Sequence, residues 1–179
     1  KNMNAELSGW NTIKVTNMQE MFRDSIYNND LNSLNVEAVT TFAHMFYNAR
    51  QFNGDLSKWS IRAATNMQDM FNNAVVFNGN VSGWITENSK VTTMSYMFHK
   101  CYLFTGVGLS EWNTGKVSNL QGLFDHNYVL NADLSKWDVS EATTMDVMFR
   151  LAKVFNSDIS KVRFFFCFFL VFFFFWGGG

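Results

Sequence analysis

The sequence predicts a leucine-rich-repeat-like solenoid, with one short parallel strand and one short helix in each coil of about 25 residues. Two observations lead to this fold class. Residues 56–77 and 134–155 match almost column by column, which is the signature of an internal repeat. Inside each unit, a short stretch with an apolar period of two is followed by a stretch with a helical period. Parallel strands joined in this way are expected to coil with a right hand.

Three aromatic columns define the repeat, which recurs at steps of 24 to 28 residues over about six units. A unit of this size cannot bury such columns alone, so successive units are expected to stack around one continuous core. We assign residues 1–161 to this single repeat domain and expect it to begin inside an earlier repeat. The columns are Trp10, Leu34, Trp59, Trp84, Trp112 and Trp137; then Phe22, Phe46, Phe71, Phe98, Phe124 and Phe149; then Tyr27, Phe52, Phe77, Phe104, Leu130 and Phe155.

The strand is predicted at the start of each unit and the helix in its middle. Leu56, Trp59 and Ile61 have the spacing of a leucine-rich repeat, with Trp59 and Ile61 facing one side of a strand. The spacing of Met67, Met70, Phe71 and Ala74 is i, i+3, i+4, i+7, which indicates one buried helical stripe, and Thr65 or Asn66 precedes it as a helix cap.

Charge and cysteine content exclude several classes of protein. The formal net charge is −1 and the charges are interspersed, which argues against nucleic acid or an anionic membrane as a partner. Two cysteines at unrelated repeat positions indicate neither a disulfide framework nor a metal site. We expect a monomer without a cofactor.

The repeat pattern W-x-V-x-x-V-T-x-M-x-x-M-F-x-x-A-x-x-F-N-x-D-L-S resembles the BspA-like leucine-rich-repeat surface proteins, in the branch described as a mycoplasma-type domain of unknown function. The resemblance covers residues 1–161. It implies a surface or secreted protein with an adhesive or recognition role. It carries no catalytic residues over to this chain.

Polar columns between the aromatic ones have structural and functional interpretations. An Asn column (Asn28, Asn53 and Asn78 among others) is expected to form a ladder of buried amides that satisfy turn backbone groups, with a ligand-binding row as the alternative. Asp30 and Asp55 belong to an acidic column that either caps turns, binds calcium, or supplies a glycosidase carboxylate pair. Turn capping is favoured, because catalysis needs one differentiated pair and every unit repeats the same group.

No metal site is expected from the histidines. His44, His99 and His126 fall at three different repeat phases, so they should point in different directions. Cys101 replaces alanine in its column and is expected to be a small core residue.

The candidate binding face is the exposed side of the predicted strands. Its side chains are polar, mixed in charge and variable between units, as in an extended surface for a protein or glycan. The same variation is typical of an unconstrained solvent face. The face residues are Lys58, Ser60, Ile85, Glu111, Asn113, Lys136 and Asp138.

Residues 162–179 form a Phe-rich tail that leaves the repeat pattern. Its apolar run, 164–176, spans roughly 20 Å as a helix and falls short of the hydrocarbon core. The tail is predicted to be a gene-model artefact, since its residues can be encoded by T- and G-rich codons as in a retained intron, or a marginal membrane segment. A membrane partner is expected only if this tail belongs to the native protein.

The sequence thus predicts a non-enzymatic repeat scaffold for protein or cell-surface recognition, located outside the cell or on its surface. A purely structural surface spacer is the alternative. A carbohydrate-active enzyme that uses the acidic column is the third hypothesis.

Overall fold

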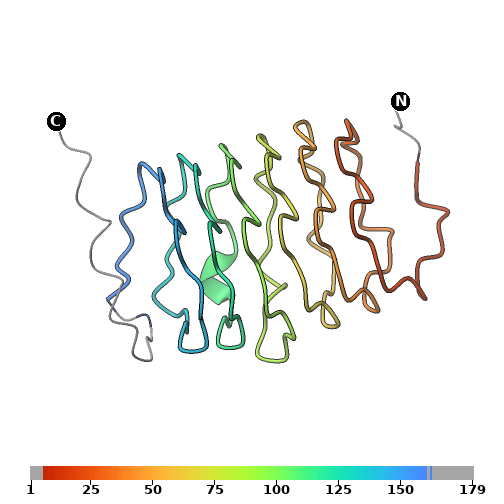
Figure 1. Cartoon of the computed structure of the whole chain (residues 1–179). Helices are drawn as coiled ribbons and strands as arrows, with labels where there is room; N and C mark the ends of the chain where they lie inside the picture. Colours follow the sequence, from red (N-terminus) through yellow and green to blue (C-terminus); the bar gives the residue numbers. More distant parts are fainter. Residues whose placement is uncertain (1–5, 161, 163–179) are drawn as a thin grey trace.

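The computed structural model describes residues 6–160 and 162, in which successive coils of the chain stack side by side (Figure 1). Each coil begins at a buried apolar residue, and the spacing of these residues defines the coils used below. They are coil 1 (7–30), coil 2 (31–55), coil 3 (56–80), coil 4 (81–108), coil 5 (109–133) and coil 6 (134–158).

The coils contain almost no regular secondary structure, so the predicted strand-plus-helix, leucine-rich-repeat-like solenoid is wrong. Within residues 6–160 and 162, the helical element is η1 (Leu109–Glu111), a single 3-10 turn at the start of coil 5. Neighbouring coils meet at isolated parallel bridges of one residue each, which do not extend into a sheet. The bridges run Asn17 to Thr41, Thr41 to Asn66, Asn66 to Thr93, Thr93 to Asn119 and Asn119 to Thr144.

Each coil is instead a series of tight turns, and the turns explain the apolar spacing. The amide of Trp59 donates to the Leu56 carbonyl at 3.1 Å, in the segment predicted to be a strand. Met70 and Ala74 donate in the same way, three residues back, to Met67 and Phe71. Such a turn brings both of its ends to the same side. The predicted core positions are therefore buried, but by turns rather than by a strand and a helix.

The predicted helix around residues 67–74 does not form because alternate amides bond to the next coil. Asp69 and Phe71 each donate at 2.9 Å across to coil 4, to the carbonyls of Ser95 and Met97. Asp69 and Asn73 also have left-handed backbones, with φ of 55° and 60°, which a right-handed helix cannot include. Thr65 does not cap a helix either; its hydroxyl donates to the Thr40 carbonyl of coil 2 at 3.2 Å.

The aromatic columns do stack into one continuous interior. The Phe71 ring lies between those of Phe46 and Phe98, with centroids 5.3 and 5.7 Å away and ring planes 2° apart in both pairs. Phe98 in turn stacks on Phe124 at 5.9 Å. All four rings are fully buried. Neighbouring coils therefore bury each other, as the repeat predicts.

The Asn ladder is confirmed, although its side chains are exposed rather than buried. Asn28 accepts a hydrogen bond from the Asn53 amide at 2.6 Å, and Asn53 accepts one from the Asn78 amide at 2.8 Å. Asn78 continues the ladder to Thr105 at 3.0 Å. Each link joins one coil to the next, so these side chains fix the spacing of the stack.

Val162, the last described residue, closes a turn like those of the earlier coils. Val162 is buried, and its amide donates to the Ile159 carbonyl at 3.1 Å, which reproduces the turn that Trp59 closes in coil 3. The apolar run 164–176 lies outside the described residues. In the part of the chain that the structure describes, no helix has the length and apolar character needed to cross a membrane.

Candidate functional site

The predicted binding face is largely exposed, with one clear exception. Lys58, Glu111, Asn113 and Lys136 are exposed, and Ser60 and Asp138 are half-buried. Ile85 is wrong as a face residue, because its side chain is fully buried in the core. The prediction assumed strand alternation, which turns do not follow.

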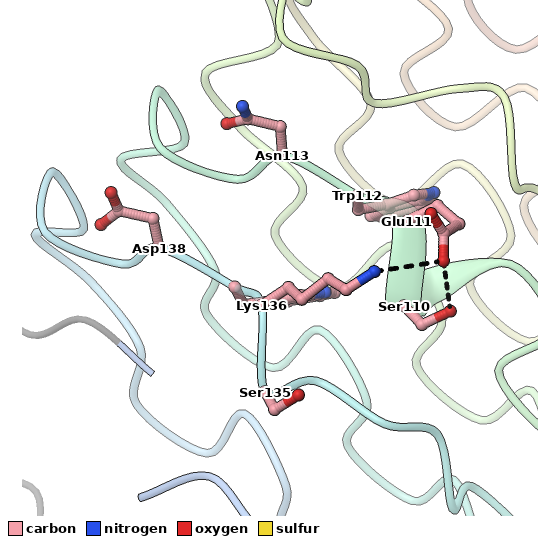
Figure 2. A pocket seen from close by; sticks show the side chains of 8 residues that line it. Ser110, Glu111, Trp112, Asn113, Ser135, Lys136 and Asp138 are labelled. Atoms are coloured by element: carbon pink, nitrogen blue, oxygen red, sulfur yellow. Dashed lines mark hydrogen bonds and ion pairs between the residues drawn. The ribbon is translucent and has the colours of Figure 1, made fainter. Parts of the chain in front are cut away.

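Coils 5 and 6 bring four of these residues together in an open groove of about 550 Å³ (Figure 2). Equivalent positions of two successive coils line this groove. Ser110 and Trp112 recur as Ser135 and Trp137, whereas Glu111 and Asn113 are replaced by Lys136 and Asp138. The lining residues are Ser110, Glu111, Trp112, Asn113, Ser135, Lys136, Trp137 and Asp138.

Two stacked indoles form the floor of this groove. The rings of Trp112 and Trp137 are 6.0 Å apart with planes 8° from parallel, and both side chains are buried. Their indole nitrogens donate to the carbonyls of Val81 at 2.8 Å and Leu109 at 2.9 Å. The indoles are therefore a rigid support and do not offer an exposed ring face to a sugar.

The sides of the groove carry charges of both signs. The Lys136 ammonium lies 3.6 Å from a Glu111 carboxylate oxygen, which also accepts a hydrogen bond from the Ser110 hydroxyl at 3.3 Å (Figure 2). The side chains of Lys136 and Glu111 are 68% and 60% exposed, so solvent weakens this pair and leaves both groups available to a ligand. Asn113 and Asp138 are held in place by accepting amide hydrogen bonds from Gly115 and Ser140.

A second groove of about 430 Å³ lies between coils 3 and 4 and includes Ser60. Its floor is again a stacked pair, Trp59 and Trp84, with ring centroids 6.2 Å apart. Its charged residue is Arg62, so this groove is basic where the groove of coils 5 and 6 is mixed. Different coils thus present different chemistry from one scaffold.

The acidic column caps turns, as favoured from the sequence. Asp30 accepts a hydrogen bond from the Asn32 amide at 2.6 Å, and Asp55 accepts one from the Ser57 amide at 2.8 Å. The Ser57 hydrogen bonds, first from its backbone and then from its hydroxyl, hold the pKa of the Asp55 carboxyl below its usual value. An acid of lowered pKa stays ionised and is unsuited to donate a proton to a glycosidic oxygen.

His99 and His126 do not diverge as predicted, whereas His44 lies apart from them beside Asp69. The rings of His99 and His126 lie 5.5 Å apart, beside the buried Asp125. His99 follows Phe98 directly, whereas Asp125 follows Phe124 and His126 is the residue after it; the stacked Phe rings bring these residues of coils 4 and 5 together. The sequence signal for this cluster is the position after the Phe column, which a helical interpretation of the segment obscured.

Cys101 is a free thiol in the core, as predicted for its column. It is fully buried and donates to the Phe71 carbonyl at 3.0 Å. Burial raises the pKa of the thiol far above its usual value, so it is not a reactive thiolate.

The stacked coils and their outward grooves define a repeat protein with an extended, coil-by-coil surface. The model of one family, described as Mycoplasma protein of unknown function, DUF285, matches the chain twice, at residues 1–84 and 85–165. The chain belongs to this family. No curated protein and no solved structure is significantly similar to it.

Proposed function

We propose that the protein is a non-enzymatic scaffold that recognises a protein or glycan through the groove between coils 5 and 6. The observation that carries this proposal is a contrast between the core and the surface. The buried aromatic residues recur at similar spacing in each coil, whereas the outward side chains differ from coil to coil. The stacked aromatic columns repeat from coil to coil, whereas the outward residues place Glu111, Lys136 and Asp138 in one groove and Arg62 in the other. A surface of this kind can be matched to a ligand without altering the fold.

The chemistry of the groove favours a polar ligand that carries hydrogen-bond donors and acceptors or both charges. Glu111 and Lys136 are exposed, and Asn113 and Asp138 are oriented by turn hydrogen bonds. The turn-capping hydrogen bonds that Asp30 and Asp55 accept argue against the carbohydrate-active enzyme. We also propose an extracellular or cell-surface location, which the likeness of the repeat pattern to BspA-like surface proteins supports.

Glycan and protein arrays probed with residues 1–162 test this proposal. We expect saturable binding that falls at least about tenfold in the double variant E111Q/K136Q, a loss of about 1.4 kcal/mol. The matched control is E20Q/R23Q, which removes another exposed ion pair, at 3.4 Å, from the distant coil 1. Binding that both double variants weaken equally would exclude the groove. No saturable ligand on either array would favour the structural spacer.

A further inference from the structure

A cluster of titratable side chains lies on a different part of the coils from the two grooves. It is built from the residues that follow the Phe column in three successive coils: His99 of coil 4, Asp125 and His126 of coil 5, and Arg150 of coil 6. The stacked rings of Phe98 and Phe124, 5.9 Å apart, set the distance between the first two coils. The position of these side chains is therefore fixed by the core.

Asp125 is the centre of the cluster and is fully buried. Its Oδ1 lies 2.8 Å from Nδ1 of His126 and 2.9 Å from Nε of Arg150. Its Oδ2 accepts a second bond from Arg150, from Nη2 at 2.6 Å. The guanidinium thus fixes the plane of the carboxylate and balances its charge.

His99 lies beside this hydrogen-bonded group but forms no hydrogen bond with it. Its Nε2 is buried and lies 3.7 Å from Oδ2 of Asp125, too far for a hydrogen bond. Among the described residues this nitrogen has no hydrogen-bond partner, although buried polar atoms normally have one. Burial lowers the pKa of the His99 imidazole, against the opposing effect of Asp125, while Lys100 lowers it further. The ring is therefore neutral near pH 7 and holds a lone pair.

We propose that His99, Asp125 and His126 bind one divalent transition-metal ion of the Zn²⁺ class. Their ligand atoms all lie within 4.8 Å of one another. Bonds of about 2.0–2.1 Å to a tetrahedral ion place two ligand atoms roughly 3.4 Å apart. The 3.7 Å between His99 Nε2 and Asp125 Oδ2 is close to that separation.

Two imidazoles and one carboxylate suit Zn²⁺, Cu²⁺ or Ni²⁺ better than Ca²⁺ or Mg²⁺, which prefer oxygen ligands. In the metal-bound form the ion takes the place of the His126–Asp125 hydrogen bond, and the His126 proton resides on Nε2. Arg150 then acts as the outer hydrogen-bond partner that orients the ligating carboxylate. The His99 and His126 side chains are 16% and 24% exposed, so an ion from solvent can reach the cluster.

The chain contains a matched control for this site. His44 of coil 2 lies beside Asp69 of coil 3, with Nδ1 3.7 Å from Oδ2, and this nitrogen also has no hydrogen-bond partner among the described residues. No second imidazole completes a three-ligand group there in the described part of the chain. His44 thus reproduces the 3.7 Å His–Asp separation of His99, through Nδ1 instead of Nε2, without the proposed site.

Titration of the chelator-treated protein with Zn²⁺, followed by calorimetry, tests the proposal. We expect one Zn²⁺ per chain, an affinity that falls at least about tenfold in H99Q, and no change in H44Q. Zn²⁺ binding should also release protons, because metal ligands bind in their deprotonated form. Co²⁺ should produce visible absorption in the wild type and in H44Q but not in H99Q.

A folded H99Q that binds Zn²⁺ as tightly as the wild type would overturn the proposal, as would equal losses in H44Q and H99Q. Absence of saturable binding would do the same and leave the cluster as a hydrogen-bonded ion network. If circular dichroism shows that H99Q does not fold, H126Q replaces it, since Arg150 still neutralises Asp125 in that variant. This inference is independent of the recognition groove, because neither groove contains its residues.

Discussion

Trp10 of coil 1 and Trp112 of coil 5 occupy the same column of the repeat, yet their surroundings differ completely. The Trp10 side chain is 51% exposed, whereas Trp112 is 1% exposed. Trp112 stacks on Trp137 of the next coil, and its indole donates to the Val81 carbonyl of the preceding one. Burial at this column therefore depends on the coils on both sides and not on the residue itself.

Stability should follow the same rule along the whole stack. A coil with a described neighbour on each side fully buries its residue of the middle Phe column, as coil 3 does with Phe71. Phe149 of coil 6 is only half-buried, although it stacks on Phe124 at 5.7 Å. The free energy of unfolding should therefore be most sensitive to substitutions in coils 2 to 5.

The largest effect is expected from truncation of a central ring. Phe71→Ala removes a fully buried side chain between Phe46 and Phe98 and should cost about 3–5 kcal/mol. Phe149→Ala removes a half-buried ring and should cost about 2 kcal/mol or less. Urea denaturation of both variants measures the two losses. Equal losses would contradict the dependence on neighbouring coils.

The next effect concerns the buried carboxylate of Asp125. Arg150→Met leaves this charge without its cation and should cost about 3 kcal/mol at pH 7, the lower end of the range for a broken buried pair, because Arg150 itself is half exposed. Arg23→Met in coil 1 is the control. Its partners Glu20 and Asp24 are exposed, so the loss should stay below about 1 kcal/mol.

The pH dependence of these variants sharpens the comparison. Burial raises the pKa of the Asp125 carboxyl, but hydrogen bonds from Arg150 and His126 lower it by more, so it lies below its unfolded value. Asp125 therefore stabilises the wild type above pH 3.8, and this contribution is lost as the pH falls through the lowered pKa. In R150M burial dominates and the pKa rises. The cost of R150M, measured by urea denaturation, should thus shrink between pH 7 and pH 4; a constant cost would exclude a charged Asp125.

The sequence predicted which residues are buried far better than it predicted the backbone that buries them. Spacing of three and four residues places Met67, Met70, Phe71 and Ala74 on one side in a helix and equally in a succession of tight turns. Periodicity alone cannot separate the two structures. The deciding feature is the left-handed backbone of Asp69 and Asn73, which their side chains tolerate but do not demand.

The candidate site was only partly predicted, because periodicity identifies outward positions but not the backbone that carries them. Glu111, Asn113, Lys136 and Asp138 line the groove as outward residues, whereas Ile85 belongs to the core of the longer coil 4. The cluster of His99, Asp125 and His126 was missed because their proximity follows from turns that repeat in register. The residue types were known from the sequence, but which backbone segments stack on one another was not.

The smallest effect separates two central tryptophans that differ in one hydrogen bond. Trp112 donates to the Val81 carbonyl at 2.8 Å, whereas the Trp84 indole nitrogen is buried and has no partner among the described residues. Both rings are nearly fully buried and stack on a neighbouring indole at 6.0 to 6.2 Å. Phenylalanine at either position therefore removes a similar volume. Only Trp112→Phe also leaves a buried carbonyl without its donor.

Trp112→Phe should consequently lower the free energy of unfolding by about 1 kcal/mol more than Trp84→Phe does. Urea denaturation with equal m-values in the two variants isolates this difference. A larger loss in Trp84→Phe would show that the Trp84 indole has a partner in solution, such as a bound water. The two tryptophans would then differ in the hydration of their indoles and not in hydrogen bonding between coils.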